Sequence, residues 1–178
     1  VAIAKKINKS ISPALLYCIA PTINPQIEQL SEQYFEQSPT DVSGVLKLIN
    51  NLSINLAVVG PENPLEAGLV DALEEIGIGC VGPKKAVAKI ETSKAFARNI
   101  LDLCCPEKNP ERKEFDSIDG VKEFLQHLNE DYVIKYDGLM GGKGVKISGE
   151  HLHSIEDSLS YASSVSYTHL RAHETVLH

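Results

Sequence analysis

One stretch of the chain concentrates glycine and lysine, the residue types that bind phosphate groups. It reads Val133-Ile134-Lys135-Tyr136-Asp137-Gly138-Leu139-Met140-Gly141-Gly142-Lys143-Gly144-Val145. Glycine has no Cβ atom, so Gly138, Gly141, Gly142 and Gly144 let the backbone approach a phosphate chain closely and point N–H groups at it. Lys135 and Lys143 add positive charge. We predict that this stretch binds phosphate groups; the alternative is a flexible hairpin whose lysines are only solvated.

The spacing of these glycines separates the stretch from two other phosphate-binding loops. It lacks the pattern G-x-x-x-x-G-K-[ST] of a Walker A loop. A strand-like segment, 145–147, follows it, whereas a helix follows the glycines of a dinucleotide-binding turn. A glycine loop between two strands therefore predicts a lid.

A second candidate is Lys94, which follows Ser93 at the expected start of a helix. A lysine at that place could contact a nucleotide phosphate. Most helix lysines, however, only face solvent. The residues alone leave both interpretations open.

The third candidate is the turn Gly60-Pro61-Glu62-Asn63-Pro64, which lies between an apolar run and an expected helix. Open α/β sheets bind ligands beyond the carboxyl ends of their strands. Free N–H groups at the helix start favour an anion, and Glu62 could bind a hydroxyl or an amine. An ordinary turn punctuated by two prolines explains the same residues equally well.

The first half of the chain shows the alternation of elements that positions such sites. We expect helices over 2–7, 25–35, 42–49 and 64–76, and strands over 15–20, 54–59 and 78–81. The continuous apolar run 54–59 is typical of a parallel strand that is covered on both faces. This order predicts an α/β fold with a doubly wound, mostly parallel sheet. Because such a domain normally opens on a strand, we expect its first strand to be missing from this chain.

We expect both helices and strands in the second half of the chain. Residues 84–103 favour helix, with a break near 91–93 where Thr92 or Ser93 could cap a second helix. A loop over 105–112 should precede a short strand at Phe115 and a helix over 121–128. The segments 132–136 and 145–147 predict a hairpin around the glycine loop, and residues 155–162 predict the start of another helix.

Composition excludes several classes of protein. The 178 residues include 17 Lys+Arg and 24 Asp+Glu, which gives a net charge of -7 without a basic cluster that could follow a nucleic-acid backbone. No apolar run is long enough to cross a bilayer, and no signal peptide is evident, so we expect no membrane partner and a cytoplasmic protein. The four cysteines follow neither a zinc-site spacing nor a disulfide framework.

Taken together and in order, these segments resemble the amino-terminal part of the phosphoribosylamine–glycine ligase family, a group of ATP-grasp enzymes. The resemblance runs from Val1 to about Ser163 and is carried by Leu56 to Leu65, Gly68 to Asp71, Val81-Gly82-Pro83, Glu91 to Phe96 and Lys135 to Val145. The Gly-Pro-Glu turn, the Ser-Lys-Ala-Phe helix start and Lys-x-Asp-Gly-Leu are specific to this family in combination.

The resemblance implies an ATP-dependent ligase of de novo purine biosynthesis, which joins glycine to 5-phosphoribosylamine through a glycyl phosphate. ATP and Mg²⁺ would be its cofactors. By resemblance, Lys94 and Lys135 contact the ATP phosphates, with Gly138, and the loop Gly141, Gly142, Lys143 and Gly144 closes over them. Gly60, Pro61, Glu62 and Pro64 would shape the site for the phosphorylated amino-sugar. Positioning and cations, rather than a protein nucleophile, would carry catalysis.

The resemblance also implies domain boundaries. Residues 1–90 would form an amino-terminal domain, the pre-ATP-grasp domain, that lacks its first strand; 91–111 would be connecting helices, and 112–163 part of the ATP-grasp lid. The stretch from Val165 onward fits nothing in the family and resembles translated sequencing-adapter DNA, so we expect residues 164–178 to be a disordered foreign tail.

Metal ligands are a further departure from the family pattern, because those of the family are expected beyond this chain. His151 and His153 are expected to be exposed, and Asp137 to orient the glycine loop rather than bind a metal. His169 and His173 lack the order His-Glu-x-x-His. We therefore expect the fragment alone to be inactive. The alternatives are another ATP-grasp carboxylate–amine ligase and a non-catalytic nucleotide-binding or unstable fragment.

Overall fold

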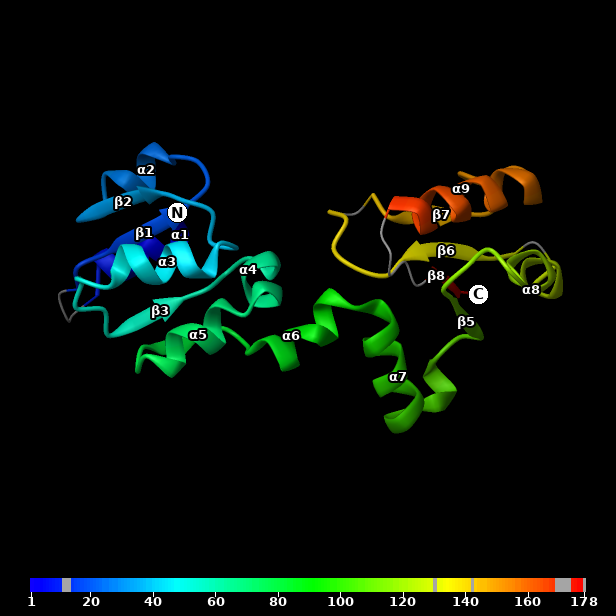
Figure 1. Ribbon diagram of the computed structural model, residues 1–178, viewed down its shortest axis with the longest axis horizontal. Coiled ribbons are helices and arrows are strands. Elements are labelled where there is room, and N and C mark those ends of the chain that lie inside the picture. The colour runs from blue at the N-terminus through cyan, green and yellow to red at the C-terminus, as the bar shows by residue number, and fades with distance from the viewer. Residues whose placement is uncertain (11–13, 130, 142, 169–173, 178) are drawn as a thin grey trace. The chain divides into compact units, whose positions relative to one another are not determined.

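The computed structural model describes residues 1–10, 14–129, 131–141, 143–168 and 174–177. The chain divides into two compact units, Val1–Val87 and Ala88–His178 (Figure 1). None of the described helices is both long and apolar enough to cross a membrane.

The strands of the first unit are parallel. Strand β1 (Tyr17–Ala20) pairs with β2 (Gln33–Glu36), and β3 (Leu56–Val58) pairs with β4 (Gly79–Val81). The predicted α/β class with parallel strands is confirmed. Within the described residues, however, the four strands form two separate two-stranded sheets rather than one continuous sheet.

Five helices are described within the first unit: α1 (Ala2–Asn8), α2 (Pro25–Glu28), α3 (Val42–Ile49), α4 (Glu62–Ala67) and α5 (Leu69–Glu75). Asn24 and Asp41 cap α2 and α3 with side-chain oxygens that accept backbone N–H groups. The core beneath both parallel pairs contains Val45, Ile49, Leu69, Leu73 and Ile78, with half-buried Ile19, Ala57 and Cys80 against it. Helices α3 and α5 therefore supply most of this core.

The helix predicted over 25–35 is wrong beyond Glu28. Strand β2 begins at Gln33, and Tyr34 and Phe35 lie in it, opposite Cys18 and Ile19 of β1. Aromatic residues fit a half-buried pleated surface well, and the pairing with β1 satisfies the backbone groups of both segments. A contact between distant segments has therefore overridden a short run with helical spacing.

Two further expectations for the first unit need correction. The helix predicted over 64–76 is divided at Gly68, whose φ of +87° ends α4 and starts α5. Strand β3 is covered on one face only, because Leu56 and Val58 are 61% and 43% exposed while Ala57 packs on the core. The reason is that α3 and α5 both contribute to the core on the Ala57 side.

The helices of the second half follow the prediction closely. Helix α6 (Lys85–Thr92) and α7 (Lys94–Cys104) are separated at Ser93, as the expected break near 91–93 requires. A short 3-10 turn, η1 (Pro106–Lys108), lies within the predicted loop. Helices α8 (Val121–His127) and α9 (Ile155–Thr168) confirm the two later helices.

The second unit contains a four-stranded antiparallel sheet in the order β5-β8-β6-β7. Its strands are β5 (Arg112–Phe115), β6 (Val133–Tyr136), β7 (Val145–Ile147) and β8 (Glu174–Leu177). The predicted strand at Phe115 and the predicted hairpin of β6 and β7 are confirmed. The buried residues of this unit's core are Phe115, Val121, Leu125, Leu128, Tyr132, Ile134, Leu152 and Ala162. Residues of α8, α9, β5 and β6 thus share one core.

The last residues differ from the predicted disorder. The structure continues α9 to Thr168 and places Glu174–Leu177 in β8, where the backbone pairs with both β5 and β6. His169 and His173 lie outside the described residues. The assignment of residues 164–178 as a foreign tail stays a prediction.

Candidate functional site

The candidate site of the second unit begins at the N-terminus of α7, where Ser93 is the N-cap residue. Its Oγ accepts a hydrogen bond from the backbone N–H of Phe96 at 3.0 Å. This bond satisfies one of the N–H groups that the first turn of a helix leaves without a partner. The cap fixes where α7 begins, and it makes Lys94 the first residue of the helix.

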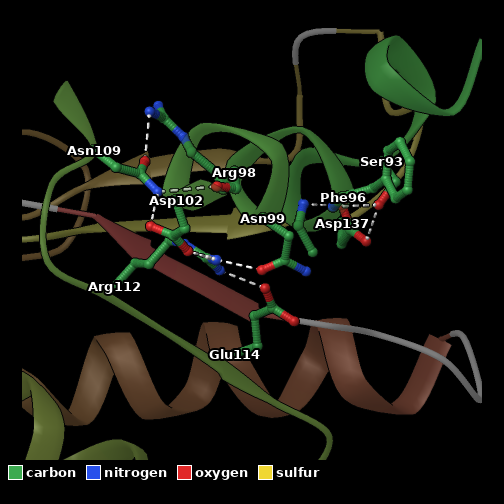
Figure 2. Close-up of polar contacts among 10 residues, drawn as sticks. Ser93, Phe96, Arg98, Asn99, Asp102, Asn109, Arg112, Glu114 and Asp137 are labelled. Atoms are coloured by element: carbon green, nitrogen blue, oxygen red, sulfur yellow. Dashed lines mark hydrogen bonds and ion pairs between the residues drawn. The ribbon is translucent and has the colours of Figure 1, made fainter. Parts of the chain in front are cut away.

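Three hydrogen bonds join this helix start to the first turn of the glycine loop. Ser93 Oγ donates to Asp137 Oδ2 at 2.9 Å, and the Ala95 N–H donates to Asp137 Oδ1 at 3.1 Å. Lys94 Nζ donates to the carbonyl oxygen of Gly138 at 2.8 Å. Figure 2 shows Ser93, Phe96 and Asp137 together at this end of the helix. Two segments more than forty residues apart in sequence therefore meet at the predicted phosphate site.

Lys135 lies on β6, two residues before Asp137, and projects away from the core. The burial of β6 alternates, because Ile134 and Tyr136 are buried while Lys135 is half-buried. Burial lowers the pKa of Lys135, and the positive charges of Arg98 and Lys94 lower it further. A half-buried ammonium group in a cationic neighbourhood is therefore stabilised by an anion.

Arg98 is a residue of this neighbourhood that sequence reasoning missed. It lies one helical turn after Lys94 on α7, and its charge acts on Lys135 more strongly than that of Lys94. Its Nη1 donates to Asn109 Oδ1 at 3.1 Å, so a neutral amide holds the guanidinium group. The spacing i, i+4 from Lys94 was the signal that could have found it, because such residues share one helix face.

A polar network at the other end of α7 supports the position of Arg98. Asn109 Nδ2 donates to the Arg98 carbonyl oxygen at 3.0 Å and to Asp102 Oδ1 at 2.6 Å. Arg112 on β5 pairs with Asp102 at 2.5 Å and also contacts Glu114 and Asn99 (Figure 2). The pKa of Asp102 is lowered by its hydrogen bonds from Asn109 and Arg112. This network ties α7 to β5 and to the loop between them.

The glycine loop itself requires glycine at two positions for identifiable reasons. Gly138 has a φ of +138°, and a Cβ there would lie 2.7 Å from the ring of Tyr136. At Gly144 a Cβ would lie 3.0 Å from the Cβ atoms of Met140 and Tyr136, closer than ordinary van der Waals contact. The Tyr136 N–H donates to the Gly144 carbonyl oxygen at 2.8 Å and closes the hairpin. The loop ends are therefore closely packed.

The tip of the loop is open. Gly141 and Lys143 are exposed, and Gly141 has a φ of +55°. Gly142 lies outside the described residues. Of the predicted phosphate-binding residues, the structure joins Lys94 and Gly138 by a hydrogen bond and brings Lys135 within electrostatic range of Lys94. The described contacts do not join Lys143 or Gly141 to these three.

The predicted turn Gly60–Pro64 belongs to the first unit. Gly60, Pro61 and Glu62 are exposed, while Pro64 is fully buried in the first turn of α4. A Cβ at Gly60 would meet nothing within 4 Å. Gly60, Pro61 and Glu62 are thus accessible to a ligand, and the buried Pro64 anchors the turn. Their role in substrate binding stays a prediction.

Acidic and histidine side chains do not gather into a metal site within the described residues, where no group of three or more His, Cys, Asp or Glu could hold an ion. His151 and His153 are exposed, as predicted. Asp137 is engaged by Ser93 and Ala95.

Comparison with protein families matches the two halves of the chain separately. Residues 1–91 match the family described as phosphoribosylglycinamide synthetase, N domain, and residues 92–176 match phosphoribosylglycinamide synthetase, ATP-grasp (A) domain. The phosphoribosylamine–glycine ligase of Methanocella arvoryzae is 37% identical over 164 residues, which are 92% of this chain and 38% of that protein. The enzyme of that name from Methanocorpusculum labreanum is 42% identical over 150 residues, 84% of this chain and 35% of its own. The chain thus spans little more than a third of these relatives.

Solved structures share the fold. The phosphoribosylamine–glycine ligase of Thermotoga maritima matches 99% of this chain and 39% of its own, with a TM-score of 0.66 and 20% identity. The biotin carboxylase domain of Hydrogenobacter thermophilus 2-oxoglutarate carboxylase, described as a complex with MgADP, ADP and bicarbonate, matches 99% of this chain and 41% of its own, with a TM-score of 0.73 and 13% identity. At these identities the likeness concerns the fold alone.

Proposed function

Because the chain belongs to the phosphoribosylglycinamide synthetase family, we propose that it supplies the phosphate-binding face of an ATP-dependent ligase. The full-length protein would join glycine to 5-phosphoribosylamine with formation of ADP and phosphate. The observation that carries the proposal is the hydrogen bond from Lys94 Nζ to the Gly138 carbonyl oxygen, with Lys135 within electrostatic range of Lys94.

The electrostatics of the second unit support a phosphate ligand. The described ion pairs involve neither Lys94, Arg98 nor Lys135. These three positive charges share one neighbourhood, in which the described contacts place a single carboxylate, that of Asp137. A nucleoside triphosphate carries negative charge that would offset these three positive charges. The glycine loop after β6 adds backbone N–H groups to the same neighbourhood. The residues present therefore fit the phosphate chain of ATP.

The proposed chemistry has two steps. An oxygen of the glycine carboxylate attacks the γ-phosphorus of ATP, which forms an acyl phosphate and releases ADP. The amine of phosphoribosylamine then attacks the acyl carbon, and phosphate leaves as the amide C–N bond forms. Lys94 and Lys135 would hold the phosphate oxygens in place and offset the negative charge of the transferred group. No side chain of this chain needs to form a covalent intermediate.

Magnesium and the amino-sugar complete the proposal. Bound Mg²⁺ would offset negative charge on the phosphate groups of ATP, and we expect its protein ligands outside this chain, since the described residues offer no acidic cluster. The exposed turn at Gly60, Pro61 and Glu62, fixed by Pro64, would help shape the site for phosphoribosylamine.

The alternative function is that of another ATP-grasp carboxylate–amine ligase, and substrate-dependent ADP release by the full-length protein separates the two. We expect sustained formation of ADP, together with glycinamide ribonucleotide, only when glycine and phosphoribosylamine are both present. ADP release with a different carboxylate, and none with glycine, would refute the proposed substrate. Failure of the protein to bind ATP at all would refute the whole proposal.

A further inference from the structure

Asp137 is the one carboxylate that the described contacts place at the N-terminus of α7, next to the lysines of the proposed ATP site. We propose that Asp137 is a positioning residue, whose carboxylate fastens the first turn of the glycine loop to this helix so that Lys94 and the loop face the same phosphate chain. The three hydrogen bonds that join Ser93, Lys94 and Ala95 to Asp137 and Gly138, which we call the clamp, are present in the unliganded chain. The role of Asp137 toward ATP rests on the proposed function.

The first part of the argument concerns the helix. Helix α7 has 11 residues, and the N–H groups of its first turn have no acceptor within the helix. Ser93 Oγ accepts a hydrogen bond from the N–H of Phe96, and Asp137 Oδ1 accepts one from the N–H of Ala95. The positive end of the helix dipole also stabilises a carboxylate there. Asp137 is therefore held by direct hydrogen bonds and by the helix field together.

The second part concerns the loop. Gly138 follows Asp137, and its carbonyl oxygen accepts the hydrogen bond from Lys94 Nζ. The partners alternate, because Ser93 and Ala95 bind Asp137 while Lys94, between them, binds Gly138. Three bonds in this arrangement fix the direction in which the chain leaves β6. Without the carboxylate, Lys94 would be the one of these three bonds left to join the loop to α7, through a flexible side chain with several rotatable bonds.

Lys94 gains its orientation from the same arrangement. Its ammonium group has three N–H donors, of which the Gly138 carbonyl uses one. Two donors stay available for a phosphate oxygen while the bond to the loop persists. The clamp can therefore position Lys94 for a ligand without being broken by that ligand.

Exchange of the Ala95 amide hydrogen in the unliganded chain, followed by NMR, tests the clamp directly. This amide has Asp137 as its acceptor and none within the helix, so its protection reports on the carboxylate. In Asp137→Ala we expect exchange about tenfold faster or more, as loss of a charge-assisted hydrogen bond implies. Asp137→Asn keeps an acceptor oxygen and should retain most of the protection. Glu123→Ala, an exposed carboxylate on α8, is the matched control and should leave exchange unchanged.

ATP affinity of the full-length protein tests the positioning role. We expect Asp137→Ala to weaken ATP binding by about tenfold, Asp137→Asn by less, and Glu123→Ala not at all. Unchanged Ala95 exchange in Asp137→Ala would overturn the clamp. Faster exchange with unchanged ATP affinity would overturn the positioning role alone. Absence of ATP binding by the unsubstituted protein would instead overturn the proposed function, while the exchange experiment would still decide the clamp. Should Asp137→Ala fail to fold, Ser93→Asp, which keeps an acceptor for the Phe96 N–H but has no hydrogen to donate to Asp137, gives the same comparison.

Discussion

Substitution of Lys135 by methionine should act on stability and on ATP binding in opposite directions. Methionine keeps most of the apolar stem of lysine but carries no charge. In the unliganded chain the ammonium group of Lys135 is half-buried and repelled by Arg98 and Lys94, which is why its pKa lies below the ordinary value of 10.5. Removal of that charge should raise the midpoint of urea-induced unfolding.

The loss in ATP affinity can be sized from the type of bond. A hydrogen bond to a charged group contributes about 1.5–3 kcal/mol, and every 1.4 kcal/mol is about tenfold in the dissociation constant. We therefore expect the full-length Lys135→Met protein to bind ATP about ten to a hundred times more weakly, as measured by calorimetry. Lys122→Met, an exposed lysine on α8, is the matched control and should change neither quantity.

The lowered pKa of Lys135 also predicts how the stability of the chain changes with pH. A lowered pKa in the folded state means that the unfolded state binds more protons, so stability rises with pH. Below its lowered pKa Lys135 is charged in the folded chain, and the penalty of that charge is relieved as pH rises through the lowered pKa toward 10.5. The stability advantage of Lys135→Met over the unsubstituted chain should therefore shrink above neutral pH. A lower urea midpoint for Lys135→Met at pH 7 would refute the reasoning, as would unchanged ATP affinity.

Three further substitutions test the core, the loop and the third cation. Leu125→Ala, at a fully buried position on α8, should lower the free energy of unfolding by about 2–5 kcal/mol in urea titrations, since it leaves a cavity. Gly144→Ala should cost about 1–3 kcal/mol by the same measurement, because the new methyl group would meet Met140 and Tyr136 at 3.0 Å; an unchanged midpoint would contradict that packing. Arg98→Gln should weaken ATP binding by about two- to fivefold, as for a partly screened charge, and the difference should vanish at high salt; a difference that persists there would argue against an electrostatic role.

The second unit was largely predictable because local signals and tertiary structure agree there. A serine before an apolar-periodic run is a common helix start, and Ser93 caps α7 as expected. Alternation along β6 and the glycines after it predicted the hairpin with β7. Where one local pattern had to compete with a distant partner, prediction failed. Tyr34 and Phe35 fit helical spacing but pair with β1, and no rule of local spacing contains that contact.

The individual residues of the site could be predicted from the sequence, but the contacts between them could not. Lys94, Lys135 and the glycines were identified from residue type and order. Arg98 was not, because its relevance depends on which face of α7 lies near β6, a tertiary fact. Asp137 was expected to orient the loop, but its two partners on α7 could not be deduced, since they lie 44 and 42 residues away in sequence.

Ser93 shows how such a connection narrows the choice of amino acid. Helix starts in general accept serine, threonine, aspartate and asparagine almost interchangeably, because each offers an acceptor oxygen. Here the hydroxyl oxygen accepts from Phe96 while its hydrogen is donated to Asp137. An aspartate at position 93 could accept the hydrogen bond from Phe96. Its carboxylate would, however, face that of Asp137, and neither group would have a hydrogen to donate to the other. The amino acids that suit position 93 are therefore limited by a distant aspartate as well as by helix formation.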